Sequence, residues 1–129
     1  MDMDAFATEV ETAIEELPPE FRAAVANVAI LLEELADDDT LDEMGIADPH
    51  ELLGLYRGLP LPERGSHYAG TEPDQVFLYR GAIEDYARAF DLSFAHCIRN
   101  TLIHELGHYL GFDDEQLHRI EFSDGPTDS

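Results

Sequence analysis

The sequence contains no lysine and only one cysteine. Its seven basic residues are all arginine, and 29 acidic residues bring the formal net charge to −22 over 129 residues. A surface this acidic repels phosphate groups and anionic lipid headgroups. We therefore expect neither nucleic acid nor a membrane as a partner. The single cysteine, Cys97, has no partner for an internal disulfide, which favours a reducing compartment.

Two further absences bear on location. No run of 18 apolar residues is found, so a membrane-spanning helix is not expected. The acidic start, Met1 to Asp4, lacks the basic residues and the apolar stretch of a secretory signal, which favours a cytoplasmic protein. The length and the 44% hydrophobic content predict a single domain over residues 1–129, with a flexible acidic start and a flexible tail at residues 123–129.

The pattern of apolar residues, prolines and glycines predicts both helices and strands. Helices are expected at residues 4–17 (ended by Pro18 and Pro19), 83–90, 93–110 and 114–120. Strands are expected at residues 24–32, 52–56 and 75–79, with a short helix as the alternative for the first. Loops are expected at the acidic stretch 33–43 and at residues 58–70. The predicted architecture is a small sheet with helices packed against it, an α+β class.

The helix predicted at residues 93–110 carries two histidines four residues apart. In an α-helix such residues point in nearly the same direction, so His104 and His108 can offer imidazole nitrogens to one metal ion. The opposite side of the helix collects four apolar residues, namely Leu102, Ile103, Leu106 and Leu110. One side of this helix is therefore predicted to enter the core and the other to bind the ion.

Glu105 lies beside the histidines and can reach a water held by the same ion. A catalytic zinc keeps three protein ligands and one water, whose pKa the metal lowers to about 7. Glu105 is therefore predicted to act as the general base, taking a proton from that water and passing it to the leaving amine.

A third ligand is expected after the helix. Gly111 stands where a left-handed residue ends a helix and turns the chain back, and Asp114 follows three residues later. Asp113 is the alternative, but with Gln116 it resembles a helix-capping pair. We therefore assign Asp113 to the cap and Asp114 to the metal, with His118 as a less favoured ligand.

The string H-E-x-x-H-x-x-G-x-x-D, carried by these residues, resembles that of the Asp-zincins. Together with the segments at residues 55–61 and 73–80, it resembles the mini-zincins, a zincin-like metallopeptidase family of minimal size. The resemblance implies a small mixed sheet packed on an active-site helix with flanking helices, a zinc ion (Zn2+) and peptidase activity. No methionine follows the motif, so the Met-turn of larger metzincins is absent.

The other polar residues carry weaker hypotheses. Residues 75–79 are either an edge strand that pairs with an extended peptide or ordinary sheet structure. Cys97 is expected to be a half-buried small residue, and His50 and His96 surface residues. A donor to a developing oxyanion is also needed, and four candidates are not ranked by the sequence: His67, Tyr68, Tyr79 and Arg80.

The sequence thus predicts a zinc-dependent peptidase that acts on peptide or protein substrates, with weak or highly selective activity. The acidic surface favours neutral or cationic substrates. The alternative is a zinc-binding interaction protein that uses the same scaffold without hydrolysis. A structural zinc site closed by a further side chain, such as His118, is the second alternative. The presence of Glu105 favours the peptidase, and the oligomeric state is not predicted.

Overall fold

A computed structural model describes residues 1–60, 62, 73–113 and 115–117. The predictions for Asp114, His118, His67, Tyr68 and the tail fall outside these residues. In chain order the elements are α1 (Met3–Glu15), α2 (Pro19–Val25), β1 (Val28–Glu33), α3 (Asp38–Met44), η1 (Pro49–Glu51), β2 (Gly54–Arg57), β3 (Asp74–Tyr79), α4 (Arg80–Ala89) and α5 (Phe94–Leu110). Residues 115–117 are also helical, within the predicted helix at 114–120.

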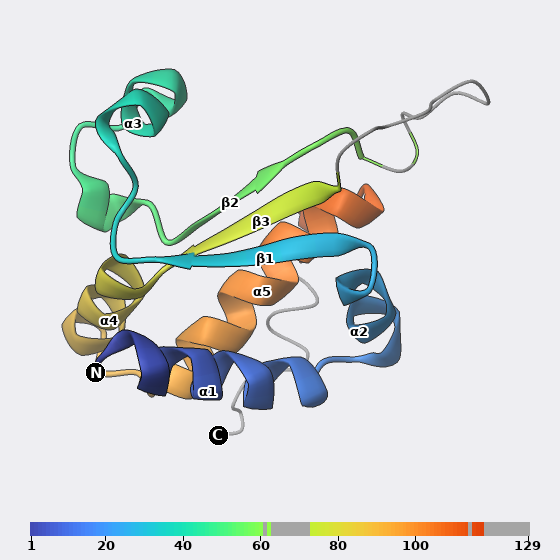
Figure 1. Cartoon of the computed structure of the whole chain (residues 1–129), viewed down its shortest axis with the longest axis horizontal. Helices are drawn as coiled ribbons and strands as arrows, with labels where there is room; N and C mark the ends of the chain where they lie inside the picture. The colour runs from blue at the N-terminus through green and yellow to red at the C-terminus, as the bar shows by residue number, and fades with distance from the viewer. Residues whose placement is uncertain (61, 63–72, 114, 118–129) are drawn as a thin grey trace.

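The three strands form one mixed sheet in the order β1-β3-β2 (Figure 1). β3 runs parallel to β1, with Val28 opposite Asp74, and antiparallel to β2, with Gly54 opposite Leu78. The predicted α+β class with a small mixed sheet is therefore confirmed. The hypothesis that residues 75–79 form an edge strand is wrong, because β3 is paired on both sides. β1 and β2 lie at the two edges of the sheet.

The main core lies between the sheet and the helices. α5 packs against β2 and β3, and α1, α2 and α4 pack against α5 (Figure 1). Leu102, Ile103 and Leu106 are fully buried there, as predicted for the apolar side of α5. Leu110 is half-buried against the same core. A smaller cluster forms separately and consists of Ala36, Leu41, Leu52, Leu55, Tyr79 and Ala82.

Two predicted elements are corrected by the structure. The stretch 33–43 is not all loop, because it contains most of α3. The Asp37 side chain caps this helix by accepting a hydrogen bond from the Thr40 N–H at 2.8 Å, and Gly45 ends it at φ 71°. The strand predicted from residue 24 begins only at Val28. α2 extends to Val25, and a turn at residues 26 and 27 leads into the strand. Pro19 lies in the first turn of α2, where a missing N–H removes no helical bond.

No helix in the described part of the chain is long and apolar enough to span a bilayer.

Candidate metal centre and active site

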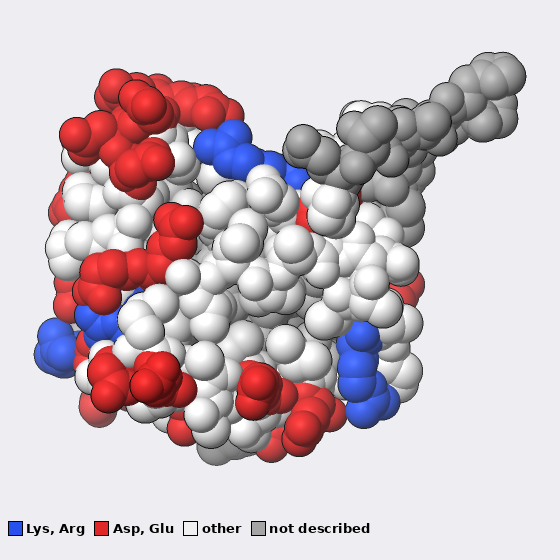
Figure 2. Space-filling model, in the orientation of Figure 1, with Lys and Arg blue, Asp and Glu red and all other residues white. Residues whose placement is uncertain are grey.

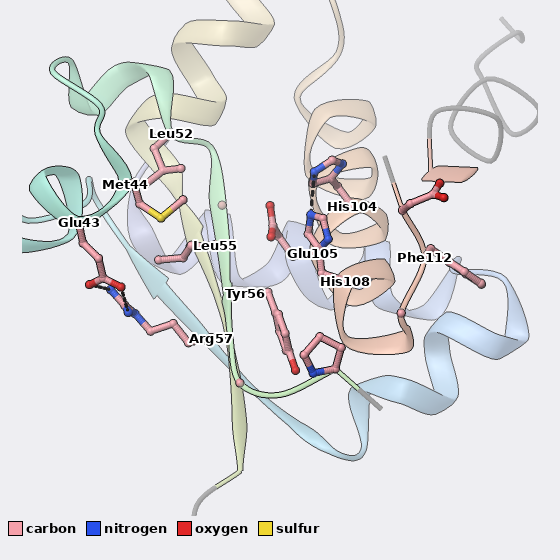
Figure 3. A pocket seen from close by; sticks show the side chains of 15 residues that line it. Glu43, Met44, Leu52, Leu55, Tyr56, Arg57, His104, Glu105, His108 and Phe112 are labelled. Atoms are coloured by element: carbon pink, nitrogen blue, oxygen red, sulfur yellow. Dashed lines mark hydrogen bonds and ion pairs between the residues drawn. The ribbon is translucent and has the colours of Figure 1, made fainter. Parts of the chain in front are cut away.

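The two motif histidines meet on one side of α5. His104 and His108 lie four residues apart, and their Nε2 atoms are 3.2 Å from each other. The rings meet edge to face with centroids 4.7 Å apart, and both side chains are half-buried. Figure 3 shows the two imidazoles side by side with Glu105 next to them. The sequence prediction that both histidines point the same way is thus met by the geometry.

This pair fits a zinc ion. Two nitrogens bound to tetrahedral zinc at about 2.05 Å each lie about 3.3 Å apart, and the observed separation is 3.2 Å. No group of three or more His, Cys, Asp or Glu side chains that could hold an ion is found among the described residues. The proposed third ligand, Asp114, is outside those residues. The structure therefore places two nitrogen donors, and the complete ligand set stays a prediction.

Glu105 is buried between α5 and the edge strand nearest to it, β2. Only 8% of its surface is exposed, and in Figure 3 its carboxylate points into the cavity towards β2. Gly54 makes this packing possible: a Cβ at that position would lie 2.7 Å from Thr101 Cγ2 and 3.1 Å from Glu105 Cγ. A side chain at position 54 would therefore displace Thr101 and Glu105 or separate β2 from α5. Gly54 is a positioning residue that sequence reasoning did not identify.

The turn after α5 follows the prediction. Gly111 has φ 94°, and the N–H of Phe112 donates to the carbonyl of Gly107 at 2.9 Å, which closes the helix. The predicted capping pair is also confirmed. The Gln116 N–H donates to Asp113 Oδ1 at 2.8 Å, and the Asp113 N–H donates to Gln116 Oε1 at 2.9 Å. The chain therefore turns at Gly111, three residues after His108.

A contact between Gly107 and Leu117 holds this returning segment against α5. Leu117 is fully buried, and a Cβ at position 107 would lie 2.1 Å from Leu117 Cδ2. Glycine in a helix interior is less favourable than alanine by about 1 kcal/mol. The absence of a side chain at position 107, within the motif itself, is thus explained by the room that Leu117 needs.

We expect Gly107→Ala to have opposite effects in two backgrounds. With Leu117 present, the added methyl group overpacks the contact and should lower the free energy of unfolding by about 1–3 kcal/mol. With Leu117→Ala the clash is gone, so the better helix propensity of alanine should raise it by about 1 kcal/mol. Urea unfolding of the four variants in this cycle measures both effects. The same sign in both backgrounds would contradict the packing argument.

A cavity of about 810 Å³ contains the motif side chains. It runs between the edge strand and the C-terminal half of α5. Fifteen residues line it: Glu43, Met44, Leu52, Gly54, Leu55, Tyr56, Arg57, Gly58, Pro60, His104, Glu105, His108, Gly111, Phe112 and Asp113. Tyr56 forms part of the wall beside the histidines. Its hydroxyl donates to Asp74 Oδ2 at 2.6 Å, and its ring packs edge-on against Tyr109.

Two of the four candidate oxyanion donors lie away from this cavity. Tyr79 is 2% exposed in the smaller core cluster, and burial raises its pKa to about 12. Arg80 forms ion pairs with Glu34 and Glu84, and these hydrogen bonds raise its pKa. Neither residue lines the cavity, so the structure does not bring them to the histidines.

The remaining polar candidates, Cys97, His50 and His96, make contacts outside the cavity. Cys97 is fully buried in the main core rather than half-buried, and burial raises the pKa of its thiol. His50 is exposed and pairs with Asp85. His96 is half-buried, with Nε2 3.0 Å from Asn100 Nδ2. These contacts give none of the three a part in the site.

Two converging imidazoles on one helix, with a buried glutamate beside them and a cavity in front, are what the H-E-x-x-H motif supplies in metallopeptidases. The model of the zincin-like metallopeptidase family matches residues 25–123, and the chain belongs to this family. The resemblance inferred from the motif is thereby confirmed. No curated protein matches the chain.

Proposed function

We propose that this protein is a zinc-dependent peptidase that hydrolyses peptide bonds in extended segments of peptides or proteins. One observation carries the proposal: the 3.2 Å approach of His104 and His108, with buried Glu105 beside them, in a cavity along the edge strand. Family membership supports the same reaction class.

In this proposal His104 and His108 bind the ion through Nε2, and Asp114 is the third ligand. Zinc, when bound, supplies a Lewis acid that polarises a carbonyl and makes water more acidic. Glu105 accepts a proton at its carboxylate from the attacking water and delivers it to the leaving amine nitrogen. Packing between α5 and β2 holds its side chain in one place and limits the access of bulk water.

The position of the edge strand β2 supports the proposal that the substrate binds in an extended conformation. β2 is paired only with β3 in the described sheet, and four consecutive residues, Gly54 to Arg57, line the cavity. A substrate segment can add to such an edge through main-chain hydrogen bonds, which places its backbone beside the histidines. The net charge of −22 favours neutral or cationic substrates. A cytoplasmic location is part of the same proposal.

We expect the zinc-loaded protein to cleave members of a broad peptide library slowly and selectively. Dialysis against a strong chelator should remove the activity, and about one equivalent of zinc per chain should restore it. Mass spectrometry of the products measures cleavage, and atomic absorption measures zinc. Bound zinc without cleavage of any peptide would contradict the peptidase and favour the zinc-binding interaction protein.

A further inference from the structure

The edge strand presents different side chains on its two faces. Gly54 and Tyr56 face α5, where Gly54 approaches Glu105 and Tyr56 packs on Tyr109. Leu55 and Arg57 face the other way. Leu55 belongs to the smaller core cluster, and Arg57 binds a residue of α3. A segment paired with β2 would alternate its own side chains between the same two faces.

The cavity continues around the edge strand to the α3 side. Its wall there is formed by Met44 at the end of α3, by Leu52 and by Leu55, as Figure 3 shows. Leu52 and Leu55 are each 8% exposed, whereas Met44 is 43% exposed and is one of the few large apolar side chains that face solvent among the described residues. An apolar side chain placed between them would cover Met44.

An ion pair borders this apolar wall. Arg57 donates to both carboxylate oxygens of Glu43, at 2.9 and 3.2 Å, and Nη2 lies 3.4 Å from Thr40 Oγ1. These hydrogen bonds keep the pKa of Glu43 below its usual value, so its carboxylate is charged at neutral pH. Acidic side chains also gather over α3, the red cluster above β2 in Figure 2. Arg57 neutralises Glu43. The like charges that an acidic substrate side chain would meet here are therefore those of the other acidic residues of α3, namely Asp38, Asp39 and Asp42.

We propose that Met44, Leu52 and Leu55 form a specificity subsite for an aliphatic or methionine side chain of the substrate. The inference rests on the proposed peptidase function and gives it a substrate class: segments with an apolar side chain next to the one that faces the histidines. Met44 is suited to such a wall, because its flexible thioether adapts to side chains of different shapes. The acidic residues of α3 next to it select against acidic substrate residues at the same position.

The test uses peptides that differ only in the residue next to the one that faces the histidines. This residue is Leu, Met, Gly or Asp. The Asp peptide should be the poorest substrate. Zinc-loaded wild type should favour the Leu and Met peptides over the Gly peptide by at least about tenfold in kcat/KM, the usual contribution of one apolar pocket. Met44→Glu should remove most of this preference, and Met44→Leu should keep it. Phe90→Glu is the matched control, because Phe90 is 63% exposed and lies outside the cavity.

Binding of the same peptides to zinc-loaded Glu105→Gln, measured by fluorescence anisotropy, separates the two proposals. If wild type cleaves no peptide but this variant binds Leu peptides more tightly than Gly peptides, the peptidase fails and the subsite stands. If wild type and Met44→Glu both cleave peptides and prefer Leu over Gly to the same extent, the subsite alone would be overturned. Neither cleavage nor binding of any peptide would overturn both.

Discussion

Replacement of Glu105 by glutamine is expected to lower kcat/KM for peptide cleavage about 1000-fold, the size of a general-base contribution. Glutamine keeps the shape of the buried side chain but cannot accept a proton from water. His104 and His108 are untouched, so the zinc content should stay at the wild-type value. Parallel measurements of cleavage rate, bound zinc and melting temperature distinguish a chemical defect from a structural one.

Glu11→Gln is the matched control for the loss of one negative charge. Glu11 is exposed on α1, away from the cavity, so this variant should cleave at the wild-type rate. Cleavage by Glu105→Gln within tenfold of wild type would remove Glu105 from the proposed chemistry. Loss of zinc together with cleavage would instead make Glu105 part of the metal site.

The helix that carries the site could be predicted because its information is local. The spacing of His104 and His108 sets their direction on α5, and the opposite apolar residues determine which side enters the core. The capping pair of Asp113 and Gln116 is local for the same reason. The direction of the histidines and the capping pair could therefore be predicted from residues within a few turns of each other, and both are present in the structure.

Features that depend on distant contacts were missed. The role of Gly54 appears only when α5 packs against β2, since its nearest neighbours are Thr101, Phe77 and Glu105. The position of β3 in the middle of the sheet is likewise a property of strand order and not of its own residues.

α3 was missed for a local reason. It is short and buries only Leu41, so its hydrophobic periodicity is weak. Its cap by Asp37 and the acidic first turn, Asp38 and Asp39, stabilise the helix in place of core packing. An acidic run can therefore be a capped helix as well as a loop, and here that helix supplies one wall of the cavity.

The choice between two neighbouring aspartates can be tested with one conservative change at each. Asp114→Asn is expected to weaken zinc binding at least about 100-fold, because even side chains that only support metal ligands contribute about 10–100-fold. Asp113→Asn should keep zinc. Asparagine caps helices as well as aspartate does, so the bond from the Gln116 N–H to position 113 survives. Competition with a chromophoric chelator measures both affinities.

The comparison is informative because Asp113 itself lines the cavity. Its Oδ1 is held by the Gln116 N–H and its own N–H by Gln116 Oε1, so the capping pair fixes the orientation of this side chain. If Asp113→Asn lost zinc while Asp114→Asn retained it, the roles would be reversed and the capping aspartate would also be the ligand. Equal retention in both variants would move the third ligand to another side chain, with His118 the next to replace.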